Sequence, residues 1–106
     1  MLFIETSEFT KHLWSHLDDD SYAALQMFLS AYPDAGDIIR ASGGIRKIRW
    51  RAKGRGKRGG SRVIYYWHIA EDHIYLLTLY GKGVKDDLTP AERAAWRKVV
   101  EEIKNG

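Results

Sequence analysis

Two apolar segments joined by a very short connection constrain the fold of this chain most strongly. Residues 61–68 and 73–80 consist largely of Val, Ile, Leu, Tyr and Trp, which favour β-strands. The four residues between them are too few for a crossover between parallel strands. We therefore expect an antiparallel hairpin. Its expected cross-strand partners are His68 with His73 and Arg62 with Leu79.

A third strand is expected just before this hairpin. Residues 45–50 alternate with period two, although Lys and Arg interrupt the apolar positions. Residues 51–60 are rich in Gly, Lys and Arg, which is typical of a loop. If this loop closes symmetrically, it pairs Arg49 with Arg62 and Lys47 with Ile64.

Helix signals flank the expected strands. Thr6 or Ser7 can cap a first helix, the acidic run 18–20 favours the start of a second, and Pro33 ends it. Residues 89–92 form a capping box with proline at the first helical position, which predicts a third helix. The expected apolar faces are Phe9, Leu13 and Leu17; Tyr22, Leu25, Leu29 and Tyr32; and Trp96, Val99, Val100 and Ile103.

These elements predict one α+β domain over residues 1–106. Residues 2–5 form a short apolar opening that suits an edge strand. The expected architecture is a small antiparallel sheet with an N-terminal helical hairpin and a C-terminal helix. We expect the helices to cover one face of the sheet, leaving the other open.

Composition excludes several classes of function. The 106 residues include no cysteine, which rules out disulfides, thiol nucleophiles, iron–sulfur clusters and cysteine-based zinc sites. No apolar run approaches the roughly 18 residues that a membrane span needs. The N-terminus lacks the basic flank and apolar core of a signal peptide. We therefore expect a cytoplasmic protein without a membrane partner.

Charge is strongly segregated along the chain. Residues 40–62 contain ten basic side chains and no acid, whereas residues 1–39 contain one base and seven acids. Such a basic segment attracts polyanions, and contacts between its cations and phosphates release counterions. Nucleic acid is therefore the expected partner. The alternative is a solvated basic loop that serves solubility.

The expected register gathers three cations on one face of the sheet. Lys47, Arg49 and Arg62 would share that face, because cross-strand partners point the same way. Like charges placed opposite one another are destabilising, which suggests that an anion binds between them. Alternatively, the three side chains spread into solvent or pair with carboxylates from elsewhere. The opposite face would carry Ile48, Trp50, Val63, Tyr65 and Trp67, buried against helices.

Three stretches of the sequence resemble the RelE/HigB superfamily of type II toxins, and within it the HigB-like branch. They are Gly43-Gly44-Ile45-Arg46-Lys47-Ile48-Arg49, the run from Lys53 to Tyr66, and Tyr75-Leu76-Leu77-Thr78-Leu79-Tyr80-Gly81-Lys82. The resemblance implies a RelE-like microbial RNase fold and an endoribonuclease that cleaves messenger RNA in the ribosomal A site, without a metal. It also implies a cognate antitoxin as a partner, beside the ribosome and its RNA.

The resemblance assigns roles to particular residues. Lys47 and Arg49 match a basic pair near the scissile phosphate, Arg62 matches an arginine that holds the phosphate, and Lys82 follows the last strand where further catalytic bases lie. The expected contacts with RNA or the ribosome are Arg46, Arg51, Lys53, Arg55, Lys57, Arg58, Tyr66 and Tyr80.

The sequence departs from the family's pattern after the last strand. Several members carry a Tyr or His there, and residues 83–88 contain neither. Tyr80 is the nearest candidate, but simple alternation places it on the face opposite Arg62. RNA supplies its own 2′-hydroxyl nucleophile, so the enzyme needs groups that move protons and stabilise charge. We assign proton transfer to Lys47, phosphate binding to Arg49 and Arg62, and assistance to the leaving group to Lys82.

The histidines offer an alternative assignment. His68 and His73 are expected at the hairpin tip, roughly 20 Å along the strand from Arg62, which is too far for a shared site. His12 and His16 have a spacing that suits a metal on a helix, but no third ligand accompanies them. We therefore expect structural or surface roles for all four.

Two other functions fit the same sequence. A non-catalytic module could bind nucleic acid through the basic segment 40–62, and a degenerate relative could bind an acidic partner without cutting RNA. All three readings predict salt-sensitive binding, so charge does not separate them. Cleavage of RNA and arrest of growth distinguish the toxin.

Overall fold

The computed structural model describes residues 1–51, 60–81, 83–85 and 87–106. Five strands form one sheet in the order β1-β5-β4-β3-β2 within this part of the chain. β1 runs parallel to β5 and the other neighbours are antiparallel, so the sheet is mixed. The elements are β1 (Leu2–Glu5), α1 (Ser7–His16), α2 (Asp19–Ala31), β2 (Asp37–Ile38), β3 (Ile45–Trp50), β4 (Ser61–His68), a 3₁₀ turn (Ile69–Glu71), β5 (His73–Gly81) and α3 (Pro90–Asn105). The predicted α+β class and the edge position of residues 2–5 are confirmed.

The three helices begin where the sequence indicates. The Thr6 hydroxyl accepts a hydrogen bond from the Phe9 amide, and the Asp18 carboxylate accepts one from the Ser21 amide. Thr89 starts α3 with both reciprocal bonds of a capping box. Tyr32 is the exception to the predicted apolar faces. It is the C-cap of α2 and is 58% exposed, because the helix ends before its side chain reaches the core.

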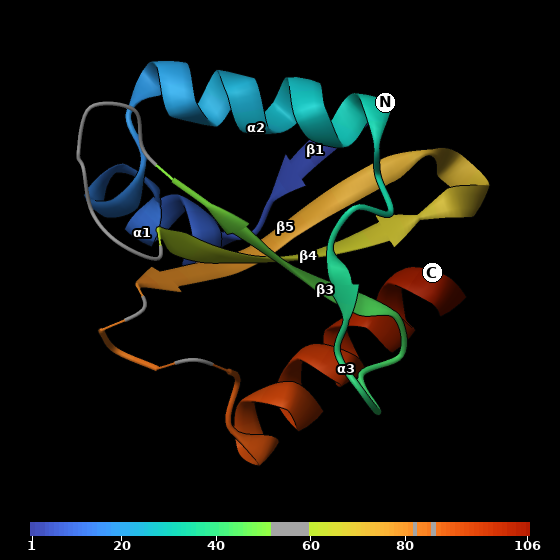
Figure 1. Cartoon of the computed structure of the whole chain (residues 1–106). Helices are drawn as coiled ribbons and strands as arrows, with labels where there is room; N and C mark the ends of the chain where they lie inside the picture. Colours follow the sequence, from blue (N-terminus) through green and yellow to red (C-terminus); the bar gives the residue numbers. More distant parts are fainter. Residues whose placement is uncertain (52–59, 82, 86) are drawn as a thin grey trace.

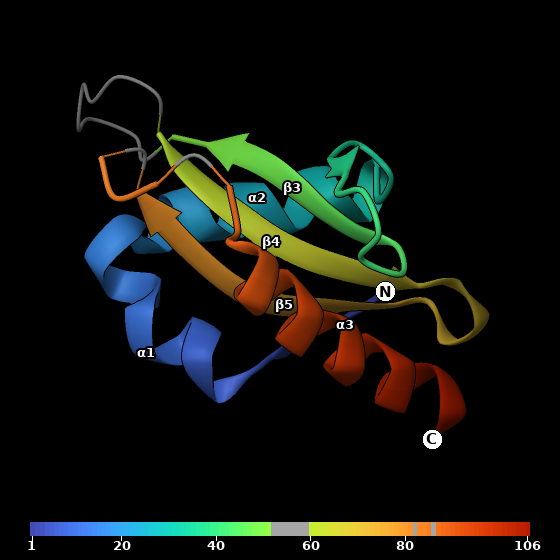
Figure 2. The same cartoon turned by 90° about the horizontal axis from the view of Figure 1, so that it is seen from below.

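The helices cover both faces of the sheet, which corrects the expectation that they lie on one. Figures 1 and 2 show α2 and α3 on opposite sides of the strands. One apolar cluster joins α1 and α2 to Val63 and Tyr65, and a second joins α3 to Ile64 and Tyr66. The physical reason is the composition of β4, whose consecutive apolar residues need cover on both sides.

A bulge in β5 changes the register of the hairpin. Tyr65 pairs with Leu76 but Ile64 pairs with Thr78, so Leu77 is an extra residue in β5. The predicted pairing of His68 with His73 is confirmed at the tip. The predicted partner of Arg62 is wrong, because beyond the bulge that partner is Tyr80.

The long loop between β2 and β3 is braced by α3. Arg97 donates a hydrogen bond to the Ala41 carbonyl at 3.3 Å, and Lys104 donates one to the Gly43 carbonyl at 2.8 Å. Within the loop, the Ser42 hydroxyl donates a hydrogen bond to the Ile39 carbonyl. The loop and the helix are therefore held in one arrangement.

Across the described residues, none of the helices has the length and apolar character to span a bilayer.

Candidate functional site

The cations of β3 and β4 meet on the sheet face that α3 partly covers. Arg49 lies directly opposite Arg62, and Lys47 lies opposite Ile64, as predicted. Lys47 and Arg49 are two residues apart on one strand, so all three side chains leave the same face. The predicted convergence of these three residues is confirmed.

The three cations have different surroundings. Arg62 is only 6% exposed, and its Nη1 donates to the Gly60 carbonyl at 3.4 Å. Lys47 is partly buried, and its ammonium donates to the carboxylate of Asp87. Arg49 is exposed and makes no hydrogen bond or ion pair within the described part of the chain. The site therefore combines a largely buried, hydrogen-bonded guanidinium with an exposed one.

Glycine at position 60 is required for this arrangement. Gly60 has φ +57°, and a Cβ there would meet the Trp50 carbonyl oxygen at 2.6 Å. Only a residue without a side chain allows the chain to enter β4 so close to the end of β3. The carbonyl that accepts the Arg62 hydrogen bond is therefore placed by this glycine.

Tyr80 joins the cationic face, contrary to simple alternation. The bulge at Leu77 turns the end of β5, so that Tyr80 becomes the cross-strand partner of Arg62. The ammonium of Lys85 lies 4.9 Å from the centre of the Tyr80 ring and also donates to Glu92. Its hydrogen bond is the main reason why the pKa of the Glu92 carboxyl lies below its ordinary value.

The remaining predicted contact residues are distributed unevenly. Tyr66 shares the face of Arg62 but is 7% exposed in the cluster under α3, so it offers little surface for a base. The Arg46 guanidinium donates to the carbonyls of Asp34 and Gly36, where it holds the connection after α2. Arg51 is exposed at the end of β3. Four predicted loop contacts and one predicted catalytic residue lie outside the described residues: Lys53, Arg55, Lys57, Arg58 and Lys82.

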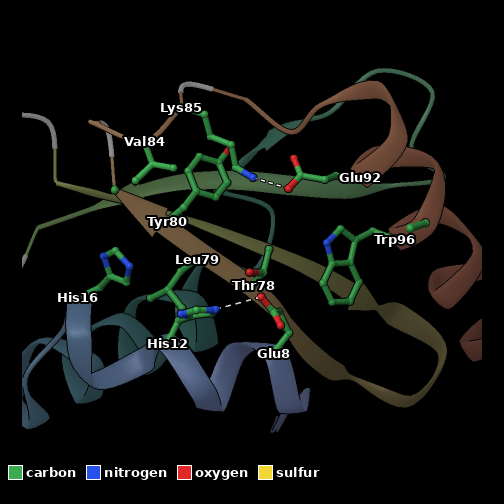
Figure 3. A pocket seen from close by; sticks show the side chains of 12 residues that line it. Glu8, His12, His16, Thr78, Leu79, Tyr80, Val84, Lys85, Glu92 and Trp96 are labelled. Carbon is green, nitrogen blue, oxygen red and sulfur yellow. Dashed lines mark hydrogen bonds and ion pairs between the residues drawn. The ribbon is translucent and has the colours of Figure 1, made fainter.

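A cavity of about 530 Å³ lies between α1, the end of β5 and α3 (Figure 3). Tyr80 lines it from the sheet and Trp96 from α3. Its acidic, histidine and lysine side chains are paired with neighbours: Glu8 with His12, His16 with Ser61, and Lys85 with Glu92. The cavity is therefore an apolar hollow with a polar rim whose groups already have protein partners.

The histidines do not form a common site. His68 and His73 face each other at the hairpin tip, at the opposite end of β4 from Arg62. His12 contacts Glu8, and His16 contacts Ser61. The described residues contain no group of three side chains suited to hold a metal ion.

Asp87 and Lys85 are site residues that the sequence reasoning missed. Both belong to the connection between β5 and α3, and each contacts the cationic face. Nothing in the periodicity of residues 83–88 indicates that this connection folds back over the sheet. The one indication in the sequence was charge. An acidic residue such as Asp87 can pair with a cation of the sheet such as Lys47, and a basic residue such as Lys85 can pair with an acid of α3.

Comparison with known proteins agrees with this architecture. Residues 6–105 match the family model described as the RelE toxin of the RelE/RelB toxin–antitoxin system. Among solved structures, one chain of the intact E. coli RelBE toxin–antitoxin complex is similar, with a TM-score of 0.55 and 15% sequence identity. The alignment covers 76% of this chain and 94% of that chain. At this identity the structural likeness establishes the shared fold.

Proposed function

Because this chain belongs to the RelE toxin family, we propose that it is a type II toxin, an endoribonuclease that cuts messenger RNA in the ribosomal A site and so inhibits translation. The observation that carries the proposal is the meeting of Arg49 and Arg62 across β3 and β4, with Lys47 beside them. Cations placed together on a partly open face suit a phosphodiester. Membership of a toxin family supports cleavage over simple binding as the proposal.

The chemistry that we assign uses the 2′-hydroxyl of the RNA as nucleophile. Arg62 holds the scissile phosphate and stabilises the charge that develops in the transition state, because its guanidinium is fixed beforehand. Arg49, which is exposed, closes on the phosphate from the neighbouring strand. The reaction needs no metal and no cofactor, because nucleophile and charge stabilisation are both provided.

Lys47 is the proposed proton-transfer group. Its ammonium is bonded to Asp87, so that contact must open or rearrange when RNA binds. Lys82 is the proposed aid to the leaving 5′-oxygen. Tyr80 is a further proposed residue of the site. It is the cross-strand partner of Arg62 and is only 6% exposed, so it would support the Arg62 side chain and offer RNA little surface for stacking.

The proposed partners follow from the family. A cognate antitoxin would silence the protein, as the similar E. coli chain comes from a toxin–antitoxin complex. The ribosome would position the messenger, which suits a site with weak bases that gains most from alignment of its substrate. The protein would then act in the cytoplasm. Among RelE relatives, the glycine-rich run after β3 favours the HigB-like branch.

The experiment is an RNA-cleavage assay with the full chain. A defined messenger is incubated with and without translating ribosomes, and the new 3′ ends are mapped. Arg62→Ala is run alongside Lys98→Ala, which removes a charge from an exposed position of α3. We expect cleavage only with ribosomes, lost in the first variant and kept in the second. Salt-sensitive RNA binding without cleavage in either condition would instead identify a non-catalytic module.

A further inference from the structure

A second, smaller pocket adjoins Lys47. Its volume is about 300 Å³. Arg40 lines it from the loop after β2, and Arg93 lines it from the first turn of α3. Lys47, Asp87 and Asp37 also line it, and Asp37 is the cross-strand partner of Lys47. The pocket is therefore continuous with the proposed cleavage site.

Within the described part of the chain, both arginines of this pocket are without a side-chain partner. Neither guanidinium makes a hydrogen bond or an ion pair with any residue that the structure describes. Arg93 is also placed unfavourably, because the helix dipole repels cations near an N-terminus. Uncompensated cations that line a hollow are the arrangement expected when an anion from outside completes the site.

The two arginines come from elements that are held together. Arg40 is next to the loop residues whose carbonyls accept hydrogen bonds from Arg97 and Lys104 of α3. Arg93 belongs to the same helix. The backbones that carry the two guanidinium groups therefore stay in a fixed relation, which lowers the entropic penalty of binding a ligand between them.

The large cavity of Figure 3 does not carry the same inference. Its charged and polar side chains are already joined to one another, as the pairs of Glu8 with His12 and Lys85 with Glu92 show. An entering anion would have to break those contacts. The smaller pocket presents two guanidinium groups that make no such contact with any described residue.

We propose that Arg40 and Arg93 form a second phosphate-binding subsite, which takes a backbone phosphate of RNA next to the one held by Arg49 and Arg62. This inference rests on the proposed function and extends it along the RNA strand. Lys47 borders both sites, so a strand that leaves the scissile phosphate passes directly into the pocket. The carboxylate of Asp37 opposes an anion there, which makes binding depend on both arginines together.

The test measures binding apart from cleavage. A fluorescent single-stranded RNA is titrated with the full chain carrying Arg62→Ala, so that cutting does not interfere. Arg40→Gln and Arg93→Gln are introduced singly and together, and Lys98→Gln is the matched control. We expect the double change to weaken binding about tenfold and to flatten the dependence of log affinity on log salt by about 0.7. Binding equal to that of the control overturns the proposal.

A complementary experiment changes the phosphates of the RNA instead of the arginines. Neutral methylphosphonate linkages are placed one at a time along the same RNA. At one linkage, the losses of binding free energy caused by the RNA modification and by the double arginine change should not add, because both changes remove the same contact. Additive losses at every linkage would mean that the arginines act only through the general field, which contradicts a subsite. Arg93→Lys, which keeps the charge, should retain most of the salt dependence.

The source of the phosphate is read by a ribosome-pelleting assay with the same variants. Loss of oligonucleotide binding assigns the subsite to the messenger, whereas loss of ribosome binding with unchanged oligonucleotide binding would place the contact on ribosomal RNA and so overturns the messenger subsite. Unchanged binding in both assays overturns it. Failure of the subsite proposal can be distinguished from failure of the cleavage proposal, because binding affinity tests the first and mapped 3′ ends test the second.

Discussion

The two faces of the sheet use the same strands but serve different purposes. On the face under α1 and α2, Val63 and Tyr65 are fully buried in a large apolar cluster. On the face under α3, Ile64 and Tyr66 are buried in the same way, but the strand ends carry Arg49 and Arg62. The first face contributes burial alone, whereas the second combines burial with a group of positive charges.

This difference shows how one strand can carry both stability and a site. In β4 the residues from Ser61 to Tyr66 are all buried, including Arg62. A buried guanidinium lowers stability unless hydrogen bonds or charges compensate it. Its retention at the end of an otherwise apolar strand is understandable when the same group binds a phosphate. The two faces should therefore respond differently to substitution.

The largest expected effect is on the cationic face. Arg62→Lys keeps the charge but loses the fork of donors that a phosphate needs. We expect ribosome-dependent cleavage to slow by about 10²-fold, the loss typical of one missing transition-state donor. The midpoint of urea unfolding should change little. A variant that cuts at the wild-type rate would show that Arg62 does not contact the reacting phosphate.

The helix-pair face should show the opposite pattern. Leu25 is 0% exposed in the cluster under α1 and α2, and Leu25→Ala should lower the free energy of unfolding by about 2–5 kcal/mol. Cleavage per folded molecule should be retained. Met27→Ala, on the same helix at a position 75% exposed, is the control. Equal destabilisation by both changes would mean that this face is not the main source of stability.

Sequence patterns predicted most of the first face and only part of the second. Capping residues and spacings of three and four located the helices, and the pairing of Arg49 with Arg62 followed from symmetric closure of the loop 51–60. The bulge at Leu77 was not predicted, because an extra apolar residue in an apolar strand leaves no break in the sequence pattern. Tyr80 was therefore assigned to the wrong face.

The placement of α3 was missed for a related reason. Its own apolar stripe was visible, but a stripe does not tell which face of a sheet it covers. The continuous burial of β4 was the better indication that both faces would be covered. The ion pair between Lys47 and Asp87 depends on a connection without periodicity, so only the structure revealed it.

The start of α3 links the second face to stability. Thr89→Ala removes one half of the capping box, and we expect a loss of about 0.5–2 kcal/mol in the free energy of unfolding. Thr89→Ser should keep the hydrogen bond and the stability. Thermal or urea unfolding measures both. If the serine variant loses as much as the alanine variant, then the methyl group of Thr89 matters more than its hydroxyl.

The smallest expected effect depends on pH and concerns the other half of the capping box. The Lys85 hydrogen bond holds the pKa of the Glu92 carboxyl below its ordinary value, so the folded protein binds this proton less readily than the unfolded chain. The stabilisation by this group is therefore complete above the ordinary glutamate pKa. It is lost as the pH falls through the lowered folded value.

Glu92→Gln isolates that contribution, because the amide oxygen can still accept the Thr89 amide hydrogen bond while the charge is removed. Unfolding followed in urea between neutral and acidic pH should show a shallower fall in stability for this variant than for the parent. Glu101→Gln, at an exposed position of the same helix, should follow the parent curve. The difference should stay below the effect of Thr89→Ala, because exposed ion pairs typically contribute no more than about 1 kcal/mol. Parallel curves for Glu92→Gln and the parent would show that the contact with Lys85 positions the connection over Tyr80 without stabilising the fold.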